Sequence, residues 1–164
     1  MKQKSGRTSR KVLSLASSTE CSCTRTLNSS AVKVSEKGRK AVFRNESRSE
    51  YEVTEIDGCL IRERLRTDCL VSKKGSASVL VELKGKNVSH ACEQLFATVA
   101  NSKVAPLLHG KIGFLVICSK FPRFDSYVIK SKQMAAKKFK AGFHVVCDSG
   151  EFDIERVVAI DGPR

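Results

Sequence analysis

The sequence predicts an α/β domain in which a mixed β-sheet is flanked by helices. Short segments rich in β-branched residues come first, and segments with helical spacing then alternate with further strands, an order typical of such a sheet. At 164 residues and 41% hydrophobic content, the chain has room for one globular domain. No apolar run approaches the roughly 18 to 20 residues that a membrane-spanning helix needs, so we expect no membrane partner.

Strands dominate the first half of the predicted domain. Tyr51 and Val53 alternate as in a strand, and Asp57-Gly58 is a turn dipeptide. The apolar run at 78–83 is typical of a buried strand. In chain order, the predicted strands and turns are 51–56, a turn at 57–58, 59–61, 68–71, a turn at 73–76, and 78–83.

Helical spacing begins after residue 86. Apolar residues recur on one face of a segment that Asn87 or Ser89 can cap and that ends near Asn101. Asp125 or Ser126 can cap a second, basic helix that runs to about residue 140. Strands are predicted at 112–118 and 143–147, and an edge strand or a tail at 151–160.

The domain boundaries follow from composition. Residues 1–30 are basic and rich in serine and threonine without an apolar period, which predicts a disordered tail. Residues 31–48 remain an unassigned lead-in, because Val32 and Val34 alternate as in a strand while 37–44 would suit a short helix interrupted at Gly38. The predicted domain occupies 49–164.

Seven cysteines, an odd number, are scattered through the predicted strands and helices, not arranged as a disulfide framework. Cys21 and Cys23 are separated by one residue, too few for the usual half of a zinc site. A reducing cytoplasm is therefore the expected location. Four cysteines are predicted to be buried as small hydrophobic residues: Cys69, Cys92, Cys118 and Cys147.

The formal net charge is +13, and residues 1–50 contribute +8 of it, with 12 Lys or Arg against 4 acidic residues. Nucleic acid is the expected partner, because lysine and arginine gain affinity for phosphates by releasing counterions. A basic tail without a partner is the alternative, and a solvated helix face explains the lysines of the second helix almost as well. The candidate phosphate-binding residues are Arg62, Arg64, Arg66, Lys130, Lys132, Lys137 and Lys138.

The candidate catalytic residues are Asp68, Glu82 and Lys84, which lie within the segment 68–84. Side chains alternate along a strand, so Glu82 and Lys84 share one face while Leu83 points to the other. A hairpin can place the carboxylates of Asp68 and Glu82 side by side, and the Leu83 carbonyl adds a third hard oxygen ligand for Mg²⁺ or Mn²⁺. Lys84 can then hold the attacking water and offset charge in the transition state.

Asp68 with Glu82-Leu83-Lys84, placed before an amphipathic helix, resembles the D…(D/E)-x-K signature of the PD-(D/E)XK (restriction-endonuclease-like) nuclease superfamily. The resemblance covers roughly 51–147 and implies an αβββαβ core that hydrolyses DNA or, less often, RNA with Mg²⁺. It implies that Asp68 and Glu82 are metal ligands and that Lys84 is the catalytic lysine. Gln94, on the following helix, is similar to the glutamine that RecB-type members place near the same site.

Two features depart from the family's pattern. Thr67 precedes Asp68 where the family has proline, and the glutamate of the family's first helix is not identifiable. Glu82 and Lys84 would also be explained by a surface ion pair, worth at most ~1 kcal/mol. The possible substitutes for the missing glutamate are Glu46, Glu50, Glu52 and Glu63.

The expected function is a metal-dependent nuclease, with DNA favoured over RNA, that acts as a small subunit of a larger defence or repair assembly. One alternative is a non-catalytic nucleic-acid-binding or scaffolding module with the same fold. A more distant alternative is a protein-interaction subunit whose tail binds a partner. The histidines carry no expected catalytic role: His90 on a polar helix face, His109 exposed in a loop, and His144 packed in a strand.

Overall fold

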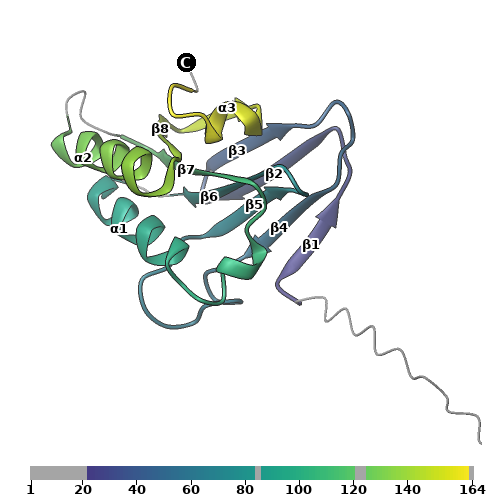
Figure 1. The fold of residues 1–164 in the computed structure, drawn as a ribbon, viewed down its shortest axis with the longest axis horizontal. Coiled ribbons are helices and arrows are strands. Elements are labelled where there is room, and N and C mark those ends of the chain that lie inside the picture. The colour runs from purple at the N-terminus through teal and green to yellow at the C-terminus, as the bar shows by residue number, and fades with distance from the viewer. Residues whose placement is uncertain (1–21, 84–85, 121–124, 163–164) are drawn as a thin grey trace, which may run out of the picture.

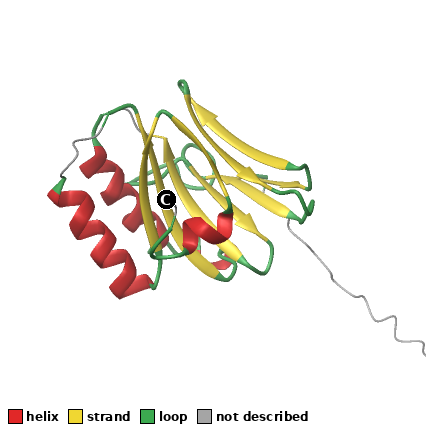
Figure 2. Ribbon diagram, turned by 90° about the horizontal axis from the view of Figure 1, so that it is seen from above, coloured by secondary structure: helices red, strands yellow, loops and turns green. Residues whose placement is uncertain are grey.

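The computed structural model describes residues 22–83, 86–120 and 125–162. These residues form three layers (Figures 1 and 2). Two helices cover one face of a six-stranded sheet, and a three-stranded sheet and a short helix cover the other face. None of the helices in this part of the chain is long and apolar enough to cross a membrane.

The large sheet is mixed. Its strands lie in the order β1-β4-β5-β6-β7-β8, antiparallel from β1 to β6 and parallel from β6 to β8. A helix bridges each parallel step, as a parallel crossover requires. The strands are β1 (Thr24–Leu27), β4 (Tyr51–Glu55), β5 (Cys69–Lys73), β6 (Ala77–Leu83), β7 (Lys111–Cys118) and β8 (Gly142–Cys147).

The small sheet contains strands from both ends of the domain. β2 (Ala31–Glu36) and β3 (Arg39–Arg44) form a hairpin, and β9 (Ser149–Phe152) pairs with β3 in parallel. The two residues of the hairpin turn, Lys37 and Gly38, have φ of 46° and 82°, the left-handed conformation that tight two-residue hairpins use.

The helices begin where the sequence predicts. Asn87 accepts a hydrogen bond from the N–H of His90, and Asp125 accepts hydrogen bonds from the N–H groups of Tyr127 and Val128, so both predicted caps are confirmed. The helical segments are α1 (Val88–Val99), a 3₁₀ turn (Ala105–Leu107), α2 (Ser126–Met134), its π-helical continuation (Ala135–Phe139) and α3 (Ile154–Val158).

Strand β6 supplies both apolar cores of the molecule. Every residue of β6 is buried, with Val79 and Val81 in the core shared with the small sheet and Leu80 in the core beneath the helices. Burial on both faces explains the continuous apolar run in the sequence. The same alternation puts Glu82 on the helix face, where a carboxylate is costly to bury without polar partners.

The order β4, β5, β6, α1, β7, α2, β8 matches the predicted succession, and a mixed α/β fold is confirmed. The extended segment predicted at 59–61 is wrong, because these residues form a turn with a single bridge from Ile61 to Asp57. The αβββαβ core implied by the resemblance has a helix before its strands. Residues 22–50 of this chain contain three strands and no helix. The restriction-endonuclease-like arrangement therefore stays a prediction.

The ordered part of the chain begins earlier than the sequence predicts. Residues 1–21 lie outside the described residues, but Thr24–Leu27, within the predicted tail, form β1. β1 is polar, and pairing with β4 and a disulfide next to it hold it at the edge of the sheet. The lead-in at 31–48 contains the β2–β3 hairpin, because Gly38 supplies a turn and does not interrupt a helix. Toward residue 160, an edge strand is present but comprises only 149–152, and 154–158, inside the predicted range of 151–160, form the helix α3 instead.

Two predictions about the cysteines are wrong. Cys23 and Cys59 form a disulfide, with Cα atoms 5.7 Å apart, because the β1–β4 pairing carries Cys23 to the turn that follows β4. Cys147 is exposed, because it ends the edge strand β8, whose burial decreases toward its C-terminus. The burial predicted for the other three thiols is confirmed for Cys69, Cys92 and Cys118.

Candidate functional site

Asp68 and Glu82 lie opposite each other at the end of the β5–β6 hairpin. Asp68 directly precedes β5, Glu82 is the penultimate residue of β6, and the last pair of this ladder joins Cys69 to Val81. The next position in the same register brings Asp68 to Glu82. The hairpin predicted to bring these two acidic residues together is therefore present.

Each carboxylate binds the backbone of the opposite strand. The N–H of Asp68 donates to Glu82 Oε2 at 3.1 Å, and the N–H of Leu83 donates to Asp68 Oδ2 at 2.6 Å. The hydroxyl of Thr67 donates to the carbonyl of Val81 at 2.7 Å. Side chains thus extend the hairpin beyond its last strand pair and fix the positions of both acidic groups.

Helix α1 holds the segment that leads to Asp68. The side-chain amide of Gln94 donates to the carbonyl of Arg66 at 2.7 Å, and the N–H of Thr67 donates to the hydroxyl of Thr98 at 2.8 Å. That hydroxyl in turn donates to the carbonyl of Gln94. Gln94 therefore positions the chain just before Asp68, and its place at a catalytic site stays a prediction.

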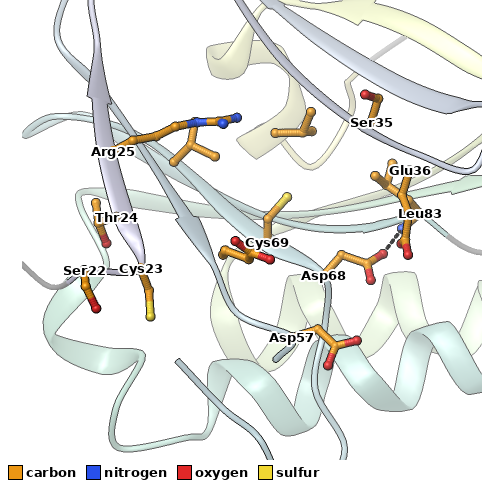
Figure 3. A pocket seen from close by; sticks show the side chains of 13 residues that line it. Ser22, Cys23, Thr24, Arg25, Ser35, Glu36, Asp57, Asp68, Cys69 and Leu83 are labelled. Atoms are coloured by element: carbon orange, nitrogen blue, oxygen red, sulfur yellow. Dashed lines mark hydrogen bonds between the residues drawn. The ribbon is translucent and has the colours of Figure 1, made fainter. Parts of the chain in front are cut away.

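A cavity of about 430 Å³ opens beside Asp68, on the face of the large sheet that β2 covers (Figure 3). It lies between the end of β2 and the strands β1, β4 and β5. Its charged lining is mostly acidic and is formed by Arg25, Glu36, Glu55, Asp57 and Asp68. The cavity gives a solute access to the Asp68 carboxyl.

The surroundings of Asp68 favour its protonated form. Burial raises the pKa of this carboxyl from 3.8 to about 6, and the hydrogen bond from the Leu83 N–H opposes the shift. The charges of Glu36 and Asp57 raise the pKa further, and the Glu36 side chain is within hydrogen-bonding reach. Acidic groups this close must share a proton or a cation to avoid repulsion.

The donor atoms at this end of the hairpin suit a hard divalent cation. Asp68, Glu82 and the Leu83 carbonyl offer oxygen ligands, which Mg²⁺ and Mn²⁺ prefer. Within the described residues, no three His, Cys, Asp or Glu side chains converge tightly enough to hold a metal ion. The oxygen donors therefore fit a hard divalent cation. In this structure, each of the two carboxylates accepts a hydrogen bond from a backbone N–H group. Lys84 lies outside the described residues.

The predicted phosphate-binding residues differ in how freely they can reach a partner. Arg62 and Arg64 are exposed, whereas Arg66 forms an ion pair with Asp57 at 2.5 Å and donates to the Arg64 carbonyl. The lysines of α2 and its π-helical continuation are all exposed: Lys130, Lys132, Lys137 and Lys138. Arg66 is therefore better suited to shaping the acidic pocket than to binding phosphate.

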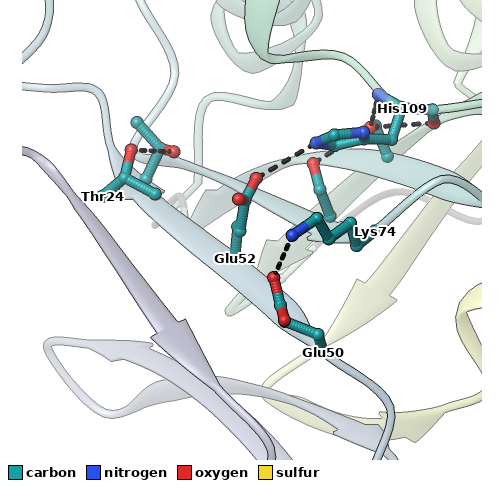
Figure 4. A network of polar contacts seen from close by, with 8 residues as sticks. Thr24, Glu50, Glu52, Lys74 and His109 are labelled. Carbon is teal, nitrogen blue, oxygen red and sulfur yellow. Dashed lines mark hydrogen bonds and ion pairs between the residues drawn. The ribbon is translucent and has the colours of Figure 1, made fainter. Parts of the chain in front are cut away.

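Glu36 is the site residue that sequence reasoning missed. Of the four glutamates considered, Glu50 pairs with Lys74 and Glu52 with His109 at the far end of β4 (Figure 4), and Glu46 and Glu63 are exposed. The pairing with Glu52 also makes His109 only partly exposed. A signal was present in the sequence, because Glu36 ends the alternating run of Val32 and Val34 directly before a turn.

Comparison with known protein families, with curated proteins and with solved structures gives no match.

Proposed function

We propose that the chain is a metal-dependent nuclease that hydrolyses phosphodiester bonds, with DNA favoured over RNA. The observation that carries the proposal is the cross-strand pair of Asp68 and Glu82. Glu82 is only 2% exposed, on a strand whose other residues are apolar, with the exception of Ser78. A buried carboxylate beside a second acidic residue is costly to the fold and calls for a chemical role.

The proposed roles follow from the donor atoms. Asp68, Glu82 and the Leu83 carbonyl would hold Mg²⁺ or Mn²⁺, and Glu36 is close enough to Asp68 to contribute a further oxygen. A bound divalent ion supplies Lewis-acid chemistry and a more acidic water. Lys84, two residues after Glu82 in the sequence, would donate hydrogen bonds to the attacking water and to the phosphate.

Exposed basic residues of the domain would hold the nucleic-acid backbone. The exposed Arg62 and Arg64 lie in the loop that leads to Asp68, and further exposed lysines lie on α2 and its π-helical continuation. An acidic site needs such flanking cations, because phosphates are otherwise repelled. A larger defence or repair assembly and a cytoplasmic location remain proposals. The Cys23–Cys59 disulfide weighs against a strongly reducing compartment.

A specific observation favours a second candidate function, a non-catalytic nucleic-acid-binding or scaffolding module. Asp68 and Glu82 each already accept a hydrogen bond from a backbone N–H, so the two acids could act only to close the hairpin. In that case the basic surface alone would carry the function. The two readings differ in whether the charge of Glu82 is needed for cleavage.

The deciding experiment compares wild type, Glu82→Ala and Glu82→Gln on labelled DNA and RNA with saturating Mg²⁺ or Mn²⁺. Glutamine keeps an oxygen that can accept from the Asp68 N–H, so this variant separates loss of charge from loss of structure. We expect both variants to lose cleavage and to retain binding measured by fluorescence anisotropy. The exposed Glu46→Gln serves as the matched control and should cleave normally. Glu82 variants as fast as wild type would refute the assignment, and an inactive wild type would favour the scaffold.

A further inference from the structure

A pair of thiols lies at the ends of two neighbouring parallel strands, outside the proposed catalytic residues. Cys118 ends β7 and Cys147 ends β8, and the two residues are directly opposite each other in the register. Their sulfur atoms are 3.9 Å apart. Strands β7 and β8 thus bring together two residues separated by α2 and its π-helical continuation.

The backbone already allows a bond between these sulfurs. Neighbouring strands lie roughly 4.8 Å apart, within the Cα separation of about 4.4 to 6.8 Å that disulfides adopt. Closing the remaining gap to a bond of about 2 Å therefore needs side-chain rotation and no large shift of the strands. Because Cys147 is exposed, no packed neighbour has to move to allow its rotation.

The two thiols differ in their access to solvent. Cys147 is exposed, whereas Cys118 has no exposed surface. A soluble oxidant can therefore reach Cys147 and cannot reach Cys118 directly. Burial, and secondarily the neighbouring Cys147, raise the pKa of the Cys118 thiol to about 12, so Cys118 is protonated at neutral pH.

We propose that Cys147 is a peroxide-reactive thiol and that Cys118 resolves its oxidised form into a reversible intramolecular disulfide. The Cys147 sulfur attacks hydrogen peroxide, the O–O bond breaks, and a sulfenic acid and one water form. The Cys118 sulfur then attacks the sulfenic sulfur, the S–O bond breaks, and the departing hydroxide takes the Cys118 proton as a second water. Two thiols lose two electrons and two protons, and one peroxide becomes two waters.

The other described cysteines provide internal references. Cys69 and Cys92 are buried free thiols, and Cys23 and Cys59 are already bonded to each other.

The new bond would form beside the proposed site, since Ile117 lies opposite Leu83 in the β6–β7 register. The Cys118 carbonyl also accepts from the Asp148 N–H, and the Asp148 carbonyl accepts from Lys40 of β3. Oxidation therefore acts at a junction between the two sheets.

The test treats the full chain with hydrogen peroxide, removes the oxidant with catalase, alkylates the denatured protein, and maps the cysteines by mass spectrometry. In wild type we expect Cys118 and Cys147 to lose alkylation together and to appear as one cross-linked peptide pair. Dithiothreitol should restore both thiols. Cys69 and Cys92 should stay alkylated throughout.

Two variants assign the roles. In Cys147→Ser, a conservative change at an exposed position, Cys118 should remain reduced. In Cys118→Ala, Cys147 should accumulate as a sulfenic acid that dimedone traps. Oxidation of Cys118 in Cys147→Ser, or wild type in which Cys147 oxidises while Cys118 stays free, would overturn the proposal. The cross-linked peptide in wild type decides the case even if Cys118→Ala fails to fold. A bond formed between two chains would also overturn it.

Discussion

Replacing Asp68 by asparagine should stabilise the protein near neutral pH and leave its stability unchanged near pH 4. In the folded chain the pKa of Asp68 is about 6, against an ordinary value of 3.8. The folded state therefore binds this proton more tightly than the unfolded state does. The stability that protonated Asp68 supplies is complete below pH 3.8 and is lost as the pH rises through about 6. Asparagine has no charge to bury and can still accept from the Leu83 N–H.

The size of the effect follows from the two pKa values. At about 1.4 kcal/mol per pKa unit, the difference between 3.8 and about 6 sets an upper limit of about 3 kcal/mol in the free energy of unfolding. Asp68 lines an open cavity, and solvent screens part of its interaction with Glu36 and Asp57. We therefore expect Asp68→Asn to gain about 1 to 2 kcal/mol above pH 7 in the absence of divalent ions.

Urea unfolding followed by circular dichroism, at about pH 4 and about pH 8, measures this difference. His144 also titrates between pH 4 and pH 8, but it does so in wild type and in Asp68→Asn alike. Its contribution to the free energy of unfolding therefore cancels when the two proteins are compared. The exposed Glu63→Gln, in the same loop region, is the control and should change stability by less than about 0.5 kcal/mol at either pH. A variant no more stable than wild type at the higher pH would refute the reasoning. If Asp68 binds a metal, adding Mg²⁺ should stabilise wild type more than Asp68→Asn.

Four further predictions concern Lys84, two N-terminal deletions and His144. Lys84→Met should lower kcat for cleavage by about 10²-fold or more in single-turnover assays while metal binding survives, and a change of only a few-fold would leave Lys84 outside the mechanism. Deleting residues 1–21, which carry five Lys or Arg and one Glu, should weaken nucleic-acid binding and flatten its salt dependence with little change in Tm. Deleting 1–30 also removes β1 and Cys23 and should cost about 2 to 4 kcal/mol. Burial lowers the pKa of His144 from 6.5 to about 4, so wild type should lose up to about 3 kcal/mol as the pH falls through this range, and His144→Gln should lose less.

The centre of the fold could be predicted because its signals are local. The run of β6 is apolar on both faces, and the spacing of α1 follows one helical face with Asn87 as its cap. The proximity of Asp68 and Glu82 also follows from local geometry, since a short turn joins the two strands that carry them. Each of these inferences needs only neighbouring residues.

The remaining features depend on contacts between distant segments. β1 contains three polar residues and one leucine, so its pairing with β4 and the Cys23–Cys59 bond could not be deduced from its composition. Glu36 reaches Asp68 from a different sheet, and no spacing rule links the two. Alternation placed Glu82 on the correct strand position but gave no sign that its carboxylate binds the Asp68 N–H.

The pairing of β3 with β9 has a consequence for the order in which the protein is made. Lys40 lies beside Ser149, so the hairpin that carries Glu36 has no third strand until β9 has been synthesised. Contacts of such long sequence separation form late, because the intervening loop must first be closed. A nascent or prematurely terminated chain would hold Asp68 and Glu82 without a fixed Glu36. The site around Asp68 would therefore be completed only when β9 docks beside β3.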